Sequence, residues 1–435
     1  MKVVGLITEY NPFHNGHKYH IEQAKRITGA DFCIAVMSGD FVQRGAPALI
    51  DKYSRTKMAL QNGVDLVLEL PVCYATGSAE FFAHGAVSIL DKIGVVDALC
   101  FGSECGDLSL LSSASHFLLN TPASFDQTLQ DYIKEGLTYP AARLKAIAAS
   151  LEDMDKAEKQ TLLSTLTEPN NILGIEYLKA LINLSSGIEP FTIQRIAAHY
   201  HEKELTSVID TNPHDTELLN PVISSATAIR NSIHRKKDTE EASAEDALQS
   251  VPEDVAQFMK ANYQTTYPII DEDFASILRY KLRMEESKDL AAYLDITPDL
   301  AERLKNLKDY NCSLASLLQD IKTKNMTLTR INRAVLHILL NIKTDQVVDY
   351  RRNGWTPYAR ILGVRKEATH FLRTIERRSS IPLIKKVAKA EQQLDALGIQ
   401  MLSSDIFAAD IYNQIIYEKF GTKLPNEYQQ GICIL

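Results

Sequence analysis

The first hundred residues alternate between short apolar runs and longer segments in which apolar and polar positions mix at helical spacing. The runs predict buried strands, and the segments between them predict helices. Strands are expected at residues 3–8, 32–37, 64–70 and 97–101, and helices at 16–28, 52–62 and 77–90. Short strands buried on both faces and separated by helices indicate a doubly wound parallel sheet, in which sites lie at the carboxyl ends of the strands.

Beyond this block the pattern is mostly helical. Residues from about 105 to 185 show no clear strand and predict a helical insertion, whereas 191–196 predicts a fifth strand. Another helix is expected at 224–234, followed by a charged, apolar-poor run at 236–245. From about residue 251 onward the pattern is almost entirely helical, so the charged run is a candidate domain boundary.

The length of 435 residues fits two to three domains. No apolar stretch approaches the roughly 20 residues needed to span a bilayer. Glu9 interrupts the apolar run at the N-terminus, which is therefore too short for the apolar region of a secretory signal peptide. The six cysteines are scattered without a CxxC pair, which suits reduced thiols. We therefore expect a cytoplasmic protein with a doubly wound α/β domain at 1–235, which contains the helical insertion, a linker at 236–250 and an α-helical region at 251–435.

Charge is distributed unevenly along the chain. The net charge is −8, but residues 321–390 contain 16 lysines and arginines against 4 aspartates and glutamates. A basic segment on an acidic body is typical of a protein that docks an anionic partner through one region. By charge alone, a solvated helix face explains the segment equally well.

The strongest local signal follows the first predicted strand. His14 and His17 stand three residues apart at the start of a helix, so their imidazoles lie on the same side near the free N–H groups of the first turn. Such an assembly binds phosphate, and the two rings are suited to donate hydrogen bonds to charge that develops on an α-phosphate. Gly16 between them would let a nucleotide approach the backbone closely.

Two other interpretations of the histidine pair stay open at this point. A pair with this spacing is often a coincidence on a helix surface. A zinc site that includes His20 is also conceivable, but no cysteine or acidic ligand stands at matching spacing. The position between a strand and a helix favours phosphate binding over both, and we expect no protein-bound metal.

The sequence from His14 to His17 resembles the HxGH signature of the nucleotidyltransferase superfamily, whose fold is Rossmann-like. A second stretch, from Ile223 to Arg230, resembles the helix-opening Ser/Thr-rich motif of that superfamily, which ends in Ile-Arg. The resemblance implies that its hydroxyls and Arg230 hold the β- and γ-phosphates, and arginine suits phosphate geometrically. The lysine-bearing motif of the class I aminoacyl-tRNA synthetases is absent.

The similarity is closer to one family. The opening segment from Val4 to His17 resembles that of the bacterial tRNA(Met) cytidine acetate ligases, and further matching stretches follow in order at 37–45, 101–104, 139–143, 170–174 and 225–230. The resemblance covers residues 1 to about 234. It implies activation of acetate by ATP to acetyl-adenylate, followed by acetyl transfer to N4 of the wobble cytidine in the anticodon loop of elongator tRNA(Met).

The family resemblance also implies roles for individual residues. His14, His17 and Arg230 are the expected catalytic residues. The expected ATP-binding residues are Ile7, Thr8, Glu9, Tyr10, Asn11, Pro12, Phe13, His14, Asn15, Gly16, His17, Lys18, Tyr19, His20, Gly102, Asn170, Arg195, Ser225 and Thr227. ATP is the expected nucleotide substrate, with Mg²⁺ bridging its phosphates and bound largely by water and substrate.

Other residues are weaker candidates. Polar side chains after the second and fourth strands stand where acetate or the tRNA would react; they are Asp40, Gln43, Arg44 and Glu104. Within the basic segment, the expected tRNA contacts are Arg351, Arg352, Arg377 and Arg378. Trp355 and Tyr358 would be able to stack on bases of the loop, although core packing explains Trp355 equally well.

Two other functions remain possible from the sequence. A small-molecule adenylyltransferase that makes a dinucleotide cofactor would explain both motifs, but not the basic segment or the chain length. A module that only senses ATP would not need His14, His17 and Arg230 together. The sequence does not indicate an oligomeric state.

Overall fold

The computed structural model describes residues 1–152, 154–195, 224–234, 247–307, 312–323 and 326–435. A central sheet has the strand order β10-β8-β5-β2-β1-β6-β7, with β9 paired to β8. Its strands are β1 (Val3–Thr8), β2 (Phe32–Ser38), β5 (Leu66–Leu70), β6 (Ala98–Ser103), β7 (Glu189–Gln194), β8 (Ala359–Val364), β9 (Leu383–Ile384) and β10 (Cys433–Ile434). Strands β5, β2, β1, β6 and β7 run parallel to one another, which confirms the predicted sheet.

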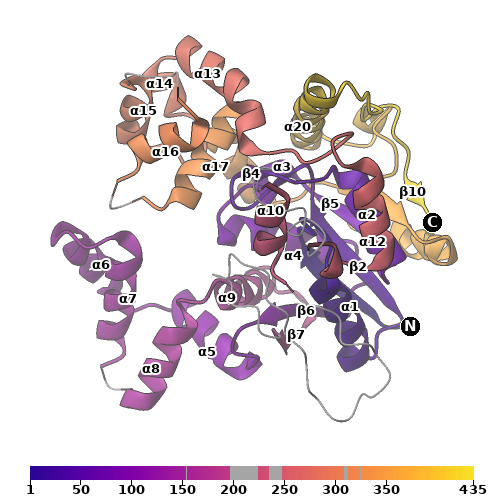
Figure 1. Ribbon diagram of the computed structural model, residues 1–435. Coiled ribbons are helices and arrows are strands. Elements are labelled where there is room, and N and C mark those ends of the chain that lie inside the picture. Colours follow the sequence, from indigo (N-terminus) through magenta and orange to yellow (C-terminus); the bar gives the residue numbers. More distant parts are fainter. Residues whose placement is uncertain (153, 196–223, 235–246, 308–311, 324–325) are drawn as a thin grey trace.

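Helices cover both faces of this sheet (Figure 1). On one face lie α1 (Asn15–Thr28), α2 (Lys52–Gln61) and α12 (Glu253–Asn262), and on the other lie α3 (Val72–Ala75), α4 (Ala79–Lys92) and α9 (Pro169–Asn183). Alternate strand residues supply the two cores. Val4 and Leu6 pack with α1 and α2, whereas Ile34 and Val36 pack with α4 and α9. This two-sided burial explains why the strands are nearly continuous apolar runs.

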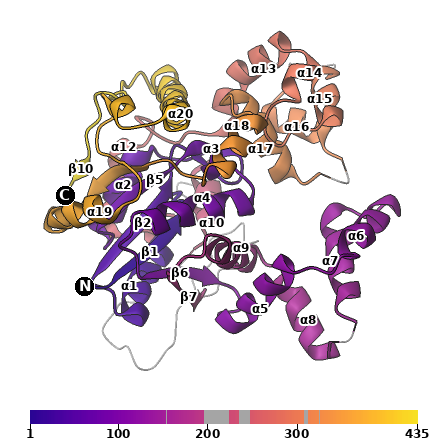
Figure 2. The ribbon, with the colours of Figure 1, turned by 180° about the vertical axis from the view of Figure 1, so that it is seen from behind.

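Two helical lobes project from the same side of the sheet in both ribbon views (Figures 1 and 2). The first contains α5 (Leu108–Leu119), α6 (Phe125–Lys134), α7 (Tyr139–Ser150) and α8 (Lys156–Thr165). The second contains η1 (Asp271–Phe274), α13 (Ala275–Met284), α14 (Ser287–Leu290), α15 (Pro298–Lys305), α16 (Leu314–Ile321) and α17 (Leu328–Leu339). The first lobe confirms the predicted helical insertion.

The C-terminal part differs from the expectation of an almost entirely helical region. Strand β8 pairs antiparallel with β5, while β9 and β10 pair with β8. The apolar pattern of β8 is broken by Arg360, whose charge is compensated by acidic residues distant in the sequence, so no local signal marked the strand. The other elements of this part are α18 (Thr344–Arg352), η2 (Lys366–Phe371), α19 (Leu372–Arg378), η3 (Ala390–Gln392) and α20 (Ala396–Phe420).

Two further local features complete the fold. A short antiparallel hairpin, β3 (Phe41–Val42) and β4 (Ala46–Pro47), follows β2 at the carboxyl edge of the sheet. Helix α10 (Ala226–His234) lies over the N-terminal end of α1, where Arg230 reaches the backbone of Asn11. The last residue of the expected strand at 191–196 and most of the expected linker at 236–250 lie outside the described residues. No helix in the described part of the chain has the length and apolar character needed to cross a membrane.

Candidate active site

A cavity of about 260 Å³ lies at the carboxyl edge of the parallel strands. Its wall combines the end of β1, the first turns of α1, the ends of β6 and β7, and parts of α4, α9, α10 and the β3–β4 hairpin. The site therefore lies at the edge that the strand pattern predicted, where the sheet's ligands are expected.

The two signature histidines form a stacked pair in this wall. The rings of His14 and His17 lie 3.6 Å apart between centroids and are nearly parallel. The backbone N–H of His14 donates to Nδ1 of His17 over 3.2 Å. Since Nδ1 of His17 accepts, a neutral His17 ring carries its proton on Nε2. The buried Nδ1 of His14 has no hydrogen-bond partner in the described part of the chain.

These rings are neutral at physiological pH. Burial, reinforced by the positive charges of Arg195 and Arg230, lowers the pKa of His14 to about 3. Burial also lowers the pKa of His17 well below its usual value, with further contributions from His14, Arg195 and His20, and it lowers that of His20 to about 4. The pair can therefore act as neutral hydrogen-bond donors, and positive charge in the cavity comes from arginine.

Two arginines from separate elements reach the cavity. Arg230 of α10 donates from Nη1 to the carbonyl of Asn11 over 2.7 Å and from Nη2 to Oγ1 of Thr227 over 3.2 Å. Arg195 follows β7, and a Cβ built on Gly102 would lie 3.3 Å from its Cγ. The bare backbone of Gly102 therefore leaves space beside the arginine stem.

Contacts from the distant segment 247–250 hold the start of α1 in place. Asn15 donates its backbone N–H to the carbonyl of Ser250 over 2.9 Å and its side-chain amide to the carbonyl of Gln249 over 3.1 Å. Oγ of Ser250 in turn donates to Oγ of Ser224 over 2.9 Å. These contacts bring both predicted motifs to one cavity although they lie far apart in the sequence.

Many expected ATP-binding residues line this cavity. They are Ile7, Thr8, Glu9, His14, Gly16, His17, Tyr19, His20, Gly102, Asn170, Arg195, Ser225 and Thr227, joined by the expected catalytic Arg230. Other expected residues lie outside its wall. Tyr10, Pro12 and Phe13 are buried in the core, Asn11 and Asn15 make the backbone contacts described, and Lys18 is exposed. These six shape the segment, and a direct contact of each with ATP remains a prediction.

The weaker candidates separate into two groups. Gln43 and Arg44 line the cavity. Glu104 lies outside the wall and accepts hydrogen bonds from the backbone N–H groups of Asn170 and Asn171 and from Nδ2 of Asn170. Asp40 lies in a buried ionic network, where burial, opposed by Lys52 and Arg55, raises its pKa to about 7. Glu104 therefore positions Asn170. Asp40 is buried away from the cavity wall and pairs with Lys52.

Several cavity residues were not predicted. Phe82, Phe101, Leu173, Tyr177 and Ile193 contribute apolar wall, and Gln194, Ser224 and Ala226 complete it. Phe101 and Tyr177 are themselves buried, so in the sequence they are indistinguishable from core residues. Only the packing of α9 against the end of β6 brings Tyr177 and Phe101 together in the cavity wall.

The predicted tRNA-binding arginines lie near opposite ends of α4. Arg351 approaches Glu80 in the first turn of α4, with Nη2 3.7 Å from Oε1, and Phe82 of the same turn lines the cavity. The carbonyl of Arg378 lies beside Gly94, just after the last turn of α4. Since α4 spans 14 residues, about 21 Å separates its two ends. Arg351 and Arg352 are therefore on the cavity side, and Arg377 and Arg378 lie far from it.

The two aromatic residues of the basic segment are not available for base stacking. Trp355 is buried and stacks on His84, with 4.6 Å between ring centroids. Tyr358 is fully buried and donates to Asp405. Core packing, the alternative weighed for Trp355, is therefore what the structure shows. The same contacts make His84 a structural histidine, whereas His199 and His201 lie outside the described residues.

Three of the cysteines are poorly suited to act as nucleophiles. Cys33, Cys73 and Cys100 are buried, and burial raises the pKa of each thiol, that of Cys100 to about 12. Among the described residues, no three His, Cys, Asp or Glu side chains converge as metal ligands. The chemistry of the cavity is therefore that of paired imidazoles, arginines, hydroxyls and one carboxylate.

Comparison with protein families gives a match over nearly the whole chain. The model of the family described as HIGH Nucleotidyl Transferase matches residues 1–427. The tRNA(Met) cytidine acetate ligase of Clostridium perfringens is 40% identical over 418 residues, which is 95% of this chain and 95% of that protein. The tRNA(Met) cytidine acetate ligase of Acetivibrio thermocellus is 37% identical over 437 residues, covering 100% of both chains.

Solved structures agree with this similarity. The crystal structure of Thermotoga maritima TmcAL bound with alpha-thio ATP superposes with a TM-score of 0.86, at 29% sequence identity and with 100% of both chains covered. The apo crystal form of the same protein gives a TM-score of 0.88 with the same identity and coverage. The similarity extends through the C-terminal half, where the sequence analysis identified no firm motif.

Proposed function

Because this chain belongs to the HIGH nucleotidyl transferases and, among them, to the tRNA(Met) cytidine acetate ligase family, we propose that it joins acetate to a cytidine of tRNA(Met) at the expense of ATP. The reaction proceeds through acetyl-adenylate, and the acceptor is N4 of the wobble cytidine in elongator tRNA(Met). One observation carries the proposal: the stacked His14–His17 pair and two arginines converge on one cavity at the sheet edge. A cofactor-forming adenylyltransferase would not account for full-length similarity to ligases that act on tRNA.

In the first step, an acetate oxygen attacks the α-phosphate of ATP and diphosphate leaves. No protein nucleophile is needed, so catalysis depends on positioning and on stabilising the charge of the transition state. His17 donates Nε2–H to the α-phosphate, and His14 supports the ring by stacking against it. Arg230, fixed by the carbonyl of Asn11, binds the outer phosphates together with Ser225 and Thr227. Arg195 and Gly102 hold the nucleotide from the β6–β7 side.

Magnesium fits this scheme as a companion of ATP. The described residues offer no three-residue cluster of metal ligands, and Mg²⁺ commonly binds through phosphate oxygens and water with few protein ligands. When bound, it would neutralise charge on the triphosphate. In this proposal the protein contributes arginine and backbone donors to the same phosphates.

Acetate-dependent exchange of label between diphosphate and ATP tests the first step. We expect exchange only when acetate is present, because acetyl-adenylate must form before the reaction reverses. Exchange that does not depend on acetate but requires a small phosphate compound would favour the adenylyltransferase. Acetylation of tRNA from acetyl-CoA without ATP would contradict the ligase, since a thioester needs no activation by a nucleotide.

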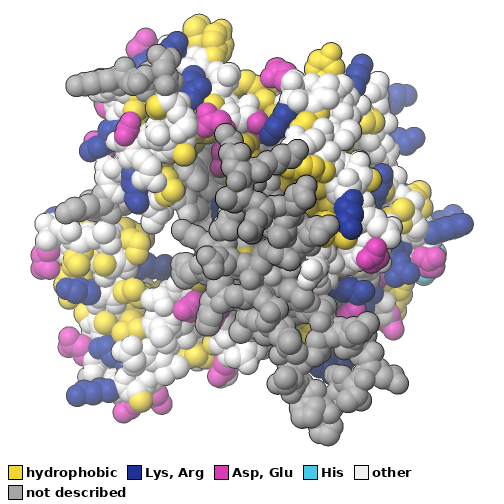
Figure 3. Space-filling model, in the orientation of Figure 1, with side chains coloured by type: hydrophobic (Ala, Val, Ile, Leu, Met, Phe, Trp, Pro, Cys, Tyr) yellow, Lys and Arg dark blue, Asp and Glu magenta, His cyan; other side chains and the backbone are white. Residues whose placement is uncertain are grey.

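The two arginine pairs provide an internal comparison for tRNA binding. On the face in Figure 3, lysines and arginines are spread around the described surface among acidic side chains, so charge alone does not define one patch. We expect Arg351→Glu with Arg352→Glu to weaken tRNA binding and to reduce its salt dependence, because the anticodon loop must approach the cavity. Arg377→Glu with Arg378→Glu should weaken binding less, because these residues lie at the far end of α4.

The comparison is measured by filter binding of tRNA(Met) over a series of salt concentrations, with exchange as the control for an intact ATP site. An equal loss of tRNA affinity in both double variants would indicate that the tRNA surface covers the whole length of α4. Unchanged affinity in both folded variants would place the surface elsewhere.

A further inference from the structure

One end of the cavity has a character unsuited to phosphate. Glu9 follows β1, Tyr177 projects from α9, and Phe82 and Phe101 come from α4 and β6. The rings of Phe101 and Tyr177 lie 5.6 Å apart between centroids. We refer to Glu9, Phe82, Phe101 and Tyr177 as the aromatic end. It combines flat apolar surface with one carboxylate and one phenol.

The carboxylate is held in place and keeps an oxygen available. Oε1 of Glu9 accepts the backbone N–H of Gln43 over 3.0 Å, and the carbonyl of Glu9 accepts from Nη1 of the buried Arg55 over 2.6 Å. Within the described part of the chain, neither Oε2 of Glu9 nor the hydroxyl of Tyr177 makes a hydrogen bond. The aromatic end therefore presents one strong acceptor and one hydroxyl to a ligand.

The side chains of the aromatic end suit one of the three substrates better than the other two. Acetate and the triphosphate carry negative charge, and a neighbouring carboxylate disfavours another anion. The cytosine ring is flat and neutral, and it packs against aromatic side chains. Its exocyclic amine donates hydrogen bonds, whereas its N3 and O2 accept them. A carboxylate and a phenol are matched to these two kinds of group.

We propose that the aromatic end is the binding site of the acceptor cytosine and that Glu9 is the general base of acetyl transfer. The assignment rests on the proposed ligase function and deepens it. It gives Glu9 a role in acetyl transfer in place of the ATP contact that the sequence analysis expected. Oε2 of Glu9 accepts a hydrogen from N4, and the Tyr177 hydroxyl donates to N3 or O2. The bond from Gln43 orients the carboxylate of Glu9, and the bond from Arg55 fixes the backbone that carries it.

The transfer step then balances as follows. The N4 lone pair forms a bond to the carbonyl carbon of acetyl-adenylate. The bond from that carbon to the phosphate oxygen breaks, and AMP leaves with its electron pair as an anion. The proton released from N4 passes to the Glu9 carboxylate and from there to solvent. A base is needed because the amine lone pair of cytosine is delocalised into the ring, which makes N4 a weak nucleophile.

Glu9→Gln separates this role from ATP binding, because the amide keeps the size of the side chain and cannot accept the proton. We expect incorporation of labelled acetate into tRNA(Met) to fall roughly 10²–10⁴-fold, the usual contribution of a general base. Acetate-dependent diphosphate exchange should fall far less.

Glu22→Gln is the matched control, since Glu22 is exposed on α1 and makes the same change of charge. Equal losses of exchange and transfer in Glu9→Gln would assign Glu9 to the ATP site or to the fold and overturn the proposal. Undiminished transfer would also overturn it. Absence of exchange in the unmodified protein would instead contradict the proposed function itself.

A second variant tests the base-binding part. Tyr177→Phe removes only the hydroxyl, so we expect kcat/KM for tRNA(Met) to fall roughly tenfold, as for one lost hydrogen bond. The KM for ATP in exchange should move less. A change confined to the KM for ATP would place the nucleotide of ATP, and not the acceptor base, against Tyr177.

Discussion

At the residue scale, the geometry of the histidine pair determines what these side chains are able to do. His17 is held by an accepted hydrogen bond at Nδ1, and the ring of His14 stacks on it. Burial lowers the pKa of both rings, and the positive charge of Arg195 lowers it further, so the imidazoles stay neutral. The arginines therefore supply positive charge to the cavity, whereas the imidazoles can donate hydrogen bonds without carrying charge.

His17→Ala should reduce acetate-dependent exchange by roughly 10²–10³-fold, the effect of losing one preorganised donor to a transition state. ATP affinity should fall less, because the arginines remain. Exchange rates and an equilibrium measurement of ATP binding give the two values. An unaltered exchange rate would show that His17 does not stabilise the transition state of adenylate formation.

The lowered pKa values also predict the pH dependence of stability without ATP. His14 has a folded-state pKa of about 3, below its ordinary value of 6.5. Between these values the unfolded chain binds a proton that the folded chain does not, so stability falls as the pH drops from 6.5 toward 3. His14→Asn should flatten the fall of the unfolding free energy over this window, measured by urea denaturation at a series of pH values. An identical slope in both proteins would mean that His14 titrates normally.

At the scale of elements, the β3–β4 hairpin connects the cavity with the second helical lobe. Gln43 and Arg44 line the cavity, and Gly45 follows them with φ of +77°. A Cβ on Gly45 would lie 2.3 Å from the backbone nitrogen of Arg333 in α17. The hairpin therefore rests directly on the backbone of α17, and only glycine allows this approach.

Gly45→Ala should destabilise the protein by about 2–4 kcal/mol, because a positive φ and a clash with backbone act together. Gly29→Ala is the control, since Gly29 has φ of +64° but no atom within 4 Å of the built Cβ. It should cost only about 1 kcal/mol. Urea denaturation measures both values, and equal effects would mean that the hairpin moves away from α17 without cost.

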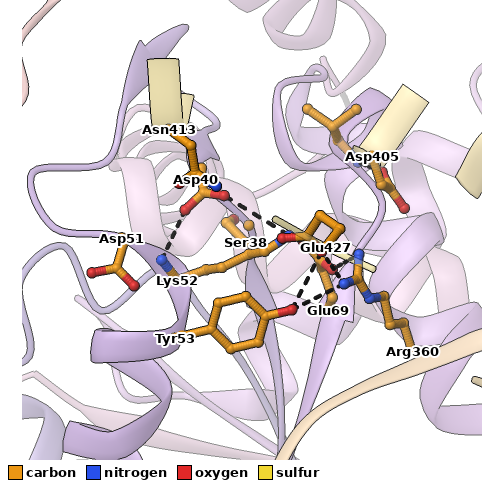
Figure 4. A network of polar contacts seen from close by, with 12 residues as sticks. Ser38, Asp40, Asp51, Lys52, Tyr53, Glu69, Arg360, Asp405, Asn413 and Glu427 are labelled. Carbon is orange, nitrogen blue, oxygen red and sulfur yellow. Dashed lines mark hydrogen bonds and ion pairs between the residues drawn. The ribbon is translucent and has the colours of Figure 1, made fainter. Parts of the chain in front are cut away.

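At the scale of the whole molecule, a buried ionic network joins the two halves of the chain (Figure 4). Nζ of Lys52 lies 2.7 Å from Oε1 of Glu69 and 3.3 Å from Oε2 of Glu427. Arg360 of β8 pairs with both carboxylates. Residues from α2, β5, β8 and the C-terminal segment therefore neutralise one another inside the protein, and each needs the others in place.

Glu427→Gln should destabilise the protein by about 3–5 kcal/mol, because it leaves buried positive charge without its partner. Burial alone would raise the pKa of Glu427, but Lys52 and Arg360 outweigh it and lower the pKa. The stabilisation is thus present above the unfolded-state pKa and is lost as the pH falls through the folded-state value. Denaturation should show the largest gap between variant and wild type at neutral pH and a smaller one in acid. Glu418→Gln, at an exposed position of α20, should change stability by less than about 0.5 kcal/mol.

The sequence by itself determined the parallel sheet, the helical insertion and the two motifs at strand–helix junctions. These features depend on local patterns: apolar runs predict strands, and a histidine pair after a strand predicts a phosphate site. Only the tertiary structure decided that β8 joins the sheet despite Arg360, that Trp355 and Tyr358 are buried, and that the arginine pairs lie near opposite ends of α4. The tertiary structure also shows that Phe82 and Tyr177 lie in the cavity wall. The physical reason is that a buried charge is tolerated only beside its partners. The partners of Arg360 are Glu69 and Glu427, which lie far from it in the chain and meet it only in the folded protein.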